Sequence, residues 1–246
     1  MESFNPFSLK GKSILVTGAS SGIGKEIAIA CAKMGAVVVL NGRDESRLNE
    51  TVSQMCGNHI ILPKDLLAFD SIPEMVNDLP QLNGIVHCAG INELIPAKLV
   101  TEADVDRIMS INFKAPVLLQ AEILRQKKML HKASVVFIAS IGSEMPIIGN
   151  SIYSASKGAI ISYSKSLMLE LAPRQIRVNC ISPGMIWTPL IENDVVSVER
   201  LKEDQKKYPL QRYGQPSDVA GLAIYLLSDA SEWMTGNNIK ISGGVV

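Results

Sequence analysis

The chain has 246 residues, of which 47% are hydrophobic, enough for one large α/β domain or two small ones with a well-buried core. Lysine plus arginine (24) equals aspartate plus glutamate (24), so no net field attracts nucleic acid or an anionic membrane surface. Aromatic residues are only 5%, which argues against a base-stacking surface. No run approaches the roughly 18 apolar residues of a membrane span, and residues 1–12 lack the apolar segment of a signal peptide. We expect a cytoplasmic protein with no nucleic-acid or membrane partner.

The cysteines are widely spaced and form neither a CxxC motif nor a Cys/His cluster. They are Cys31, Cys56, Cys88 and Cys180. Since Cys31 lies on a helical pattern and Cys88 and Cys180 lie in apolar strand-like runs, we expect buried free thiols. No metal site is predicted.

A glycine-rich turn connects the first predicted strand (13–16) to a helix that ends at Gly35, and a buried strand (37–40) follows. Gly18, Gly22 and Gly24 allow close approach of the backbone to a ligand, and a helix N-terminus offers free N–H groups to a pyrophosphate. The spacing is GxxxGxG rather than the GxGxxG fingerprint. The turn therefore predicts a dinucleotide site, with a glycine turn that binds nothing as the alternative.

The end of the second strand indicates which dinucleotide is preferred. NAD sites carry an acidic residue about 20 residues after the glycines, but this strand ends Asn41-Gly42-Arg43 and no acid occurs before Asp44. The guanidinium of Arg43 suits a 2′-phosphate, with Asn41 and Ser20 as further donors. We predict that NADP(H) is preferred and that NAD(H) is a second acceptable cofactor. A solvated arginine at the start of a polar helix is the competing interpretation.

The rest of the chain continues to alternate strands and helices. Further strands are predicted at 59–66, 84–90, 134–140, 177–184 and 238–244, and further helices at 71–79, 101–129, 151–172 and 216–229. This alternation predicts one doubly wound α/β domain over residues 1–246, with a mostly parallel sheet of about seven strands. The polar stretch from Ile186 to about Tyr213 is predicted to form a substrate-binding lid.

Several residues near the strand ends are candidates for ligand contact. Asp65 and Leu66 end the third strand, where they could flank an adenine, and Ala89 and Gly90 are small enough for the backbone to pass close to a ligand. His87 lies inside an apolar strand, so a core role is favoured over a catalytic one. Asn112, within the 101–129 helix, indicates either a specific task or a kink near Pro116.

Tyr153 and Lys157 are four residues apart in a helical pattern, which places their side chains on one face. A tyrosine has a reference pKa of about 10, and a nearby lysine cation favours its phenolate form. Ser140 ends the preceding strand, where its hydroxyl could polarise a carbonyl oxygen. An exposed helix pair without chemistry is the alternative.

Taken together, these motifs resemble the short-chain dehydrogenase/reductase family of the compact, single-domain type, nearly end to end. The family's TGxxxGxG turn corresponds to residues 17–24, its active-site asparagine to Asn112, its serine to Ser140, and its YxxxK pair to Tyr153 and Lys157. Its PG turn is Pro183-Gly184, followed by Thr188, and its NNAG segment is replaced by His87-Cys88-Ala89-Gly90.

The resemblance implies a three-layer Rossmann fold and an oxidoreductase. Tyr153 would be the general acid in ketone reduction, Ser140 would hold the carbonyl oxygen, and Lys157 would lower the tyrosine pKa and bond the nicotinamide ribose. Asn112 would anchor a water that links Lys157 to solvent. The implied cofactor contacts are Gly18, Ser20, Ser21, Gly22, Ile23, Gly24, Asn41, Arg43, Asp65, Leu66, Cys88, Ala89, Gly90, Tyr153, Lys157, Pro183, Gly184, Ile186 and Thr188.

Overall resemblance to the bacterial 3-oxoacyl-carrier-protein reductases implies that the substrates are 3-oxoacyl thioesters on acyl carrier protein. Basic residues that could meet an acidic carrier are Lys127, Lys128, Lys132 and Arg174, of which Arg174 falls at a carrier-contacting position of those enzymes; His131 occupies the other such position. The alternatives are a dehydrogenase of a sugar, polyol or other small secondary alcohol, and a catalytically idle NADP-binding sensor or scaffold. The resemblance also implies a homotetramer in which helices within 113–171 pack between subunits and the C-terminal strand lies near a second interface.

Overall fold

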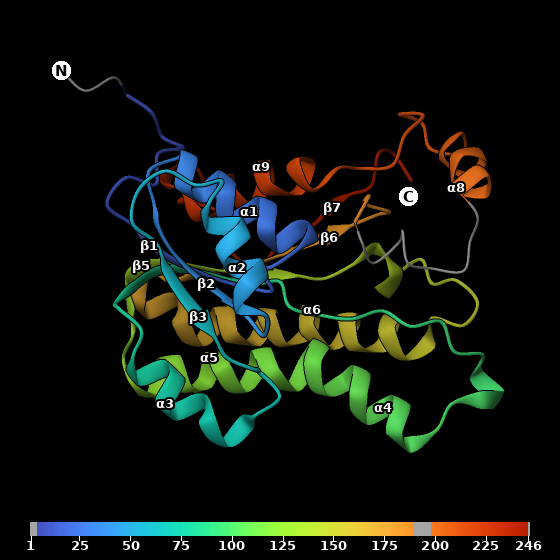
Figure 1. The fold of residues 1–246 in the computed structure, drawn as a ribbon, viewed down its shortest axis with the longest axis horizontal. Coiled ribbons are helices and arrows are strands. Elements are labelled where there is room, and N and C mark those ends of the chain that lie inside the picture. Colours follow the sequence, from blue (N-terminus) through green and yellow to red (C-terminus); the bar gives the residue numbers. More distant parts are fainter. Residues whose placement is uncertain (1–3, 189–197, 246) are drawn as a thin grey trace.

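A computed structural model describes residues 4–188 and 198–245. In this part of the chain seven strands form one sheet in the order β3-β2-β1-β4-β5-β6-β7, and all neighbouring pairs are parallel (Figure 1). The strands are β1 (Ser13–Thr17), β2 (Val37–Gly42), β3 (Ile60–Pro63), β4 (Leu82–His87), β5 (Met129–Ile138), β6 (Arg177–Pro183) and β7 (Asn238–Ile241). The predicted doubly wound fold is confirmed, and the described sheet is wholly rather than mostly parallel.

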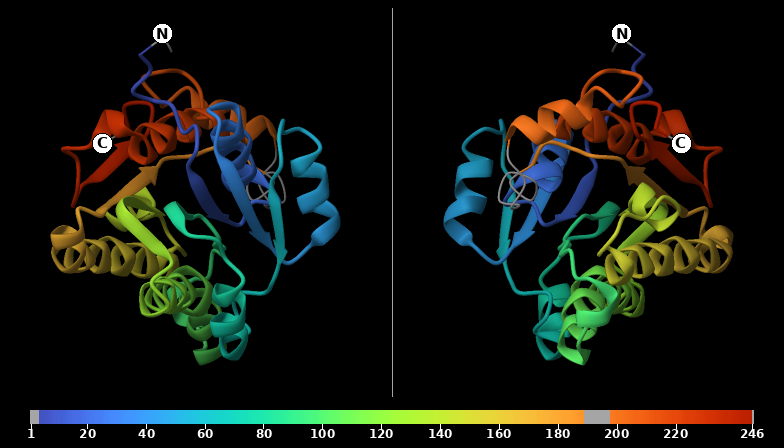
Figure 2. Two further views of the ribbon diagram at one scale, coloured as in Figure 1. Left: turned by 90° about the vertical axis from the view of Figure 1, so that its left-hand side faces the viewer. Right: turned by 90° about the vertical axis from the view of Figure 1, so that its right-hand side faces the viewer.

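Helices cover both faces of the sheet, which explains why its strands are continuous apolar runs. α1, α2 and α9 lie on one face, whereas α3, α4, α5 and α6 lie on the other (Figures 1 and 2). The helices are α1 (Gly22–Lys33), α2 (Glu45–Val52), α3 (Ile72–Asn77), α4 (Glu102–Met109), α5 (Ala115–Arg125), α6 (Ser151–Leu171), α8 (Val198–Gln205) and α9 (Pro216–Leu227).

The core is divided into two layers by the sheet. In β1, Ile14 and Val16 pack with α1 and α9, while Leu15 packs with the α3, α5 and α6 side. All three side chains are fully buried. This follows from the two-residue period of a strand, which sends successive side chains to opposite faces.

The helix predicted over 101–129 is wrong in its extent. A π-helical segment, Ser110–Lys114, separates α4 from α5. α5 ends at Arg125, and Lys127 adopts the left-handed conformation (φ 56°), which stops a helix. β5 then begins at Met129, paired with Leu82 of β4. The basic residues from Lys127 to Lys132 therefore surround the start of a strand and do not form a helix end.

The reversal of strand order between β1 and β4 positions the functional site. In open parallel sheets, ligands bind beyond the carboxyl ends of the strands where the order reverses. Thr17, the last residue of β1, accepts hydrogen bonds on Oγ1 from the backbone N–H groups of Cys88 (3.0 Å) and Ala89 (3.1 Å). The segment after β4 is thus held beside the glycine turn after β1.

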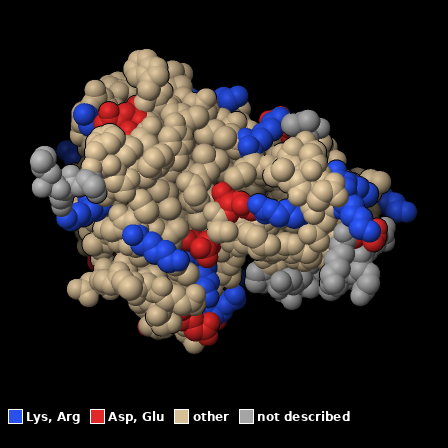
Figure 3. Space-filling model, turned by 90° about the horizontal axis from the view of Figure 1, so that it is seen from above, with Lys and Arg blue, Asp and Glu red and all other residues tan. Residues whose placement is uncertain are grey.

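The surface carries both signs of charge. Seen from above, basic and acidic side chains are interspersed on a mostly uncharged face (Figure 3), in keeping with the net charge of zero. Of the helices that the structure describes, none has the length and apolar character to cross a membrane.

Candidate active site

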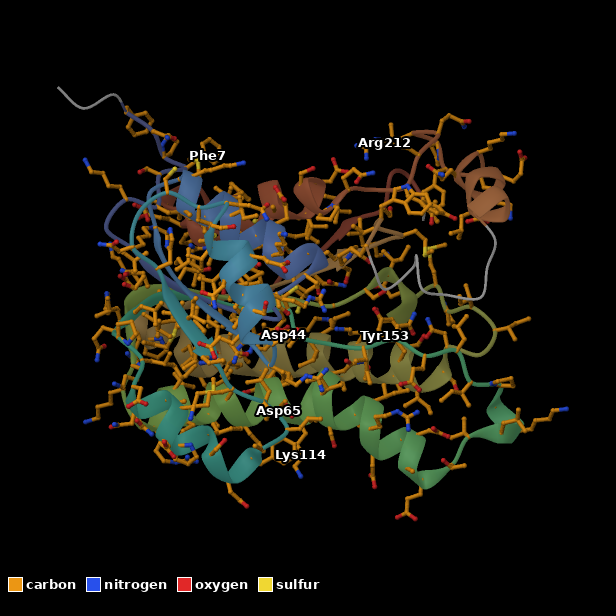
Figure 4. All side chains as sticks on the ribbon, in the orientation of Figure 1. Phe7, Asp44, Asp65, Lys114, Tyr153 and Arg212 are labelled. Carbon is orange, nitrogen blue, oxygen red and sulfur yellow. The ribbon has the colours of Figure 1, made fainter. Side chains whose placement is uncertain are left out.

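A cleft of about 1110 Å³ opens at the carboxyl end of the sheet. Every residue predicted to contact the cofactor lines it, and so does Ser140. Asp65, which follows β3, and Tyr153, near the start of α6, both belong to its wall (Figure 4). The fold therefore brings together residues from six strand ends, those of β1 to β6, and from α6.

The glycine turn forms a cradle at one part of this cleft. Gly18 has a positive φ of 67°, and a Cβ atom on Gly24 would lie 2.2 Å from the Gly18 carbonyl oxygen, so no side chain fits there. α1 starts at Gly22 with no acidic residue in its first turn, and the side chain of Ser21 does not cap it. Its first N–H groups remain available to an anion at the positive end of the helix dipole.

Two arginines line the cleft beyond the tip of β2. Arg43 and Arg47 are exposed, and neither forms an ion pair within residues 4–188 and 198–245. Asp44 caps α2 by accepting a hydrogen bond from the Arg47 backbone N–H (3.1 Å), which fixes Arg47 one helical turn from Arg43. Sequence reasoning missed Arg47, although its spacing from Arg43 on a polar helix was a usable signal.

Asn41 does not have the role predicted for its side chain. Its amide Nδ2 donates to the carbonyl oxygens of Leu62 (3.1 Å) and Lys64 (3.0 Å). Because both amide hydrogens are used, they are not available to a phosphate. Asn41 instead joins β2 to the end of β3. Ser20 does lie near the β2 tip, since a Cβ on Gly42 would be 3.2 Å from its Oγ.

Ser140 and Tyr153 meet at the other part of the cleft. Ser140 follows β5, and its Oγ accepts a hydrogen bond from the Gly142 N–H (3.0 Å). Tyr153 lies in the first turn of α6 and lines the cleft with Ser140. Burial raises the pKa of Tyr153, while the nearby Ser140 hydroxyl acts in the opposite direction. The net direction is the reverse of that predicted from the Tyr153–Lys157 spacing.

Lys157 lies one turn further along α6 and is 6% exposed. Its Nζ donates to the carbonyl oxygen of Ile138 (2.9 Å) and lies 5.7 Å from the centroid of the Tyr153 ring. Burial lowers the pKa of Lys157 to about 8. At neutral pH the group is therefore still mostly a cation, held on the tyrosine side of the cleft.

Asn112 lies behind the cleft wall, in the π-helical segment, and is 2% exposed. Its Oδ1 accepts from the Ile91 N–H (2.9 Å), and its Nδ2 donates to the Ile91 carbonyl oxygen (2.9 Å) and to Ser156 Oγ (3.0 Å). Ser156 in turn donates to the Tyr153 carbonyl oxygen (2.7 Å). Asn112 thus ties the loop after β4 to α6, and the predicted water relay cannot use its amide N–H groups.

Another wall of the cleft is mainly apolar. It is formed by Met145, Pro146, Ile147, Met185, Tyr208 and Val245. Tyr208 packs edge-on against Tyr213 (ring centroids 5.2 Å apart), and the Tyr213 hydroxyl donates to Asp204 Oδ2 (2.7 Å). Of the predicted lid, 186–213, residues 189–197 lie outside the described part of the chain.

An ion-pair cluster borders the same wall. Arg107 of α4 donates from Nε to Glu93 Oε1 (3.0 Å) and from Nη2 to Asp104 Oδ1 (2.7 Å). Glu93 and Arg107 both line the cleft. With two carboxylates bound to it, Arg107 is not a free cation for an anionic substrate.

Comparison with known proteins places these residues in a family. The family model described as enoyl-(acyl carrier protein) reductase matches residues 18–246. The 3-oxoacyl-(acyl-carrier-protein) reductase of Rickettsia felis is 32% identical over 97% of this chain and 98% of that protein. Human dehydrogenase/reductase SDR family member 4 is 32% identical over 96% of this chain and 88% of that protein. The chain belongs to the short-chain dehydrogenase/reductase family.

Solved structures of this family superimpose closely. A glucose/ribitol dehydrogenase-type short-chain dehydrogenase/reductase from Brucella melitensis has a TM-score of 0.90 and 30% identity, covering 98% of this chain and 99% of that one. A Beutenbergia cavernae protein proposed to be an NAD(P)-dependent gluconate 5-dehydrogenase, with NADP bound at low occupancy, has a TM-score of 0.87 and 29% identity, covering 98% of both chains. The protein is accordingly a short-chain dehydrogenase/reductase oxidoreductase with the Rossmann-like fold.

This short-chain dehydrogenase/reductase uses His87 as a core residue, as predicted. The ring is 5% exposed, stacks on Phe137 with centroids 4.6 Å apart, and its Nε2 lies 3.1 Å from Gln120 Oε1. Burial lowers the pKa of His87 to about 4. The ring is therefore neutral under physiological conditions.

Three of the thiols of this short-chain dehydrogenase/reductase, Cys31, Cys88 and Cys180, stay protonated at neutral pH. Burial raises the pKa values of Cys31 and Cys88 to about 12 and of Cys180 to about 11, and Cys56 is exposed. Cys88 lines the cleft, but a neutral thiol is a weak nucleophile. The described residues contain no group of three or more His, Cys, Asp or Glu able to hold a metal ion.

Proposed function

We propose that this protein is an NADPH-dependent reductase of carbonyl compounds and that 3-oxoacyl thioesters are its substrates. The observation that carries the proposal is the convergence, in one cleft, of an anion cradle, two unpaired arginines and the Ser140–Tyr153–Lys157 group. A binding module has no need of that last group, which argues against an idle sensor or scaffold.

The residues present fit a phosphorylated dinucleotide. The uncapped start of α1 and the bare backbone at Gly18 and Gly24 suit a pyrophosphate. Arg43 and Arg47 supply two cations beside the β2 tip, and the carboxylate that follows, Asp44, is engaged in capping α2. This donor set favours NADP(H) over NAD(H).

The nicotinamide supplies the hydride when it is bound. Tyr153 gives a proton to the carbonyl oxygen, and Ser140 donates a hydrogen bond to the same oxygen as negative charge develops on it. The raised pKa of Tyr153 keeps its hydroxyl protonated at neutral pH, which is the form that reduction needs. The cation of Lys157 stabilises the phenolate that remains.

The substrate assignment follows from the cleft wall and from the relatives. Met145, Ile147, Met185 and Val245 offer apolar surface to an acyl chain, whereas a sugar would require many polar partners. Relatives named 3-oxoacyl-(acyl-carrier-protein) reductase cover nearly the whole chain. A sugar or polyol dehydrogenase is the second candidate, favoured by the structural likeness to the proteins described as glucose/ribitol and gluconate dehydrogenases.

Two measurements test this proposal. Oxidation of NADPH is followed with an acetoacetyl thioester and with a panel of keto-sugars and keto-acids, and we expect turnover with the thioester. Tyr153→Phe should lower kcat by at least about a hundredfold and leave the dissociation constant of NADPH within about twofold. No NADPH oxidation with any thioester would overturn the substrate assignment, and full activity of Tyr153→Phe would overturn the catalytic one.

Acyl carrier protein is the proposed carrier of the thioester, but not all of the predicted basic contacts are free. Lys128 Nζ donates to the carbonyl oxygens of Asn77 and Leu79 (both 2.8 Å), and Arg174 donates to that of Met129. The exposed members are Lys127, His131 and Lys132. They surround the amino end of β5, whereas the cleft lies at the carboxyl ends, so a carrier docked there would serve the cleft of a neighbouring subunit.

We further propose that the protein is cytoplasmic and forms a homotetramer. Leu118 of α5 (37% exposed) and Leu169 of α6 (69% exposed) leave apolar surface within the 113–171 segment. β7 is an edge strand of the sheet, with backbone groups free for a second contact. Both features support packing between copies of the chain.

A further inference from the structure

Tyr208 lines the cleft from a cluster that is separate from the main core. Its side chain is only 8% exposed. The other members of the cluster are Leu201, Tyr213, Met185, Trp187 and Val245. Within the described residues, this cluster shares no buried member with the two layers that cover the sheet. The packing of those layers therefore does not fix the position of Tyr208 directly.

The segment that carries Tyr208 is tied to the rest of the fold at its C-terminal end. The Trp187 N–H donates to the Gly214 carbonyl oxygen (2.9 Å), and the Gly214 N–H donates to the Met185 carbonyl oxygen (2.9 Å). These bonds join the strand end after β6 to the residue just before α9. They leave Tyr208, further from α9 along the chain, to be held by other contacts.

The turn after β7 supplies such contacts, and it lies beside the segment between α8 and α9 (Figure 1). The Leu210 N–H donates to the Gly243 carbonyl oxygen (3.2 Å). A Cβ atom on Gly244 would lie 2.8 Å from Pro209 Cγ and 2.9 Å from Pro209 Cβ, so the proline ring packs against bare backbone. Gly244 also has a positive φ of 94°, which other residues adopt only with strain. Two independent constraints thus require glycine at this position.

The same turn is anchored to the sheet on its other side. The Gly184 N–H donates to the Ile241 carbonyl oxygen (2.9 Å), and a Cβ atom on Gly184 would lie 3.1 Å from Ser242 Cα. Within the turn, Ser242 Oγ donates to the Val245 carbonyl oxygen (2.6 Å). Val245 itself lines the cleft. The turn is therefore fixed to the end of β6 on one side and packs against Pro209, next to Tyr208, on the other.

We propose that Gly244 is a positioning residue for the substrate: its bare backbone lets Pro209 pack against the turn after β7 and so places Tyr208 and Val245 at the wall that the acyl chain contacts. A side chain at this position would separate the turn from Pro209 and displace that wall. Neither Tyr208 nor Val245 takes part in the proton transfer, so the displacement would act on substrate binding. The inference rests on the proposed function, which supplies the acyl chain.

The test uses two thioesters of one thiol, acetoacetyl and 3-oxooctanoyl, which carry the same reacting ketone and differ by four carbons in the acyl chain. Gly244→Ala should raise KM for the 3-oxooctanoyl thioester about tenfold, because a small misplacement of a binding wall is costly. The rise for the acetoacetyl thioester should be less than about threefold, since less of the chain reaches the wall. The kcat values and the dissociation constant of NADPH should stay within about twofold.

Pro209→Gly tests whether the contact itself is responsible. Alone, it removes the packed ring and should raise KM for the 3-oxooctanoyl thioester about threefold. In the Gly244→Ala background it should instead lower KM, because the atoms that the new methyl group meets are gone. Such a reversal of sign is the mark of two residues in direct contact. Two losses that simply add would overturn the proposed contact.

Gly11→Ala controls for backbone strain. Gly11 has a positive φ of 76°, and a Cβ atom there would meet nothing in the described chain within 4 Å beyond the neighbouring residues. This variant should lower the thermal midpoint, as Gly244→Ala does, and leave both KM values unchanged. Equal KM rises for the two thioesters in Gly244→Ala, or no rise in either Gly244→Ala or Pro209→Gly, would overturn the inference. Absence of turnover by the wild type with both thioesters would instead count against the proposed function.

Discussion

Burial sets the chemistry of single side chains in this protein. His87, at the end of β4, is buried in the core beside Gln120, and burial lowers its pKa to about 4. Lys157 is also buried, but its pKa of about 8 leaves it charged at pH 7. Loss of hydration lowers the pKa of both groups. His87 is nevertheless neutral at pH 7 and Lys157 is charged, because their reference pKa values differ by about four units.

The buried histidine should make the fold sensitive to acid. A histidine has a pKa of about 6.5 in an unfolded chain. Between pH 6.5 and about pH 4, His87 is therefore protonated in the unfolded state but still neutral in the folded state. Its contribution to stability is present above pH 6.5 and is lost as the pH falls through that window. We expect the wild type to lose about 2 kcal/mol more than His87→Asn between pH 7 and pH 5.

Urea unfolding of both proteins at the two pH values measures this difference. His131→Asn, at an exposed position of β5, is the matched control and should retain the wild-type dependence. Identical pH dependence in the wild type and His87→Asn would show that His87 is protonated as easily in the folded state as in the unfolded one.

At the scale of elements, the break between α4 and α5 organises the back of the site. The π-helical segment Ser110–Lys114 inserts an extra residue into a helical path and carries Asn112. From there the amide reaches both backbone groups of Ile91 and also Ser156 on α6. A Cβ on Gly90 would lie 2.9 Å from Asn112 Oδ1 and 3.4 Å from Lys157 Nζ. Three elements are thereby packed around one asparagine.

Asn112→Ala should destabilise the fold as well as the site. It leaves the part-buried N–H and carbonyl of Ile91 without their partner, and we expect a loss of about 2–4 kcal/mol in the free energy of unfolding. We also expect a lower kcat, because Gly90 and Tyr153 lose their common support. Chemical denaturation and steady-state kinetics measure the two effects, with Asn77→Ala, at the exposed end of α3, as the control. A loss of activity with unchanged stability would indicate a direct chemical role for Asn112 instead.

At the scale of the molecule, the parallel sheet places the cleft at the carboxyl ends of its strands. Apolar side chains are exposed on other parts of the surface. Leu118 and Leu169 are exposed on α5 and α6, and β3 and β7 are the two edges of the described sheet. The basic residues near the start of β5 lie at the opposite end from the cleft. The proposed assembly would cover these apolar side chains.

Leu169→Glu should weaken the proposed tetramer. A charge placed in an apolar contact must be desolvated without a partner, so we expect smaller species at micromolar concentration, as measured by light scattering after size-exclusion chromatography. Trp233→Glu, fully exposed near the C-terminal end, provides the comparison. A wild type that is monomeric, or a Leu169→Glu variant that remains tetrameric, would contradict an interface at α6.

The sequence by itself determined the fold class and the positions of the cleft residues. Alternating apolar runs and helical patterns specify a doubly wound sheet, and in such a sheet the turns after the strands must meet at one end, so that Gly18, Arg43, Ser140 and Lys157 could be named in advance. Local spacing cannot decide what depends on distant neighbours. Only the tertiary structure showed that the Asn41 amide bonds to the end of β3 and that a π-helical segment interrupts the helix at Asn112. It also showed that Oδ1 of Asn150, in the cleft wall, has no hydrogen-bond partner in the described chain. It also reversed the expected pKa shift of Tyr153, because burial raises this pKa by more than the nearby Ser140 hydroxyl lowers it.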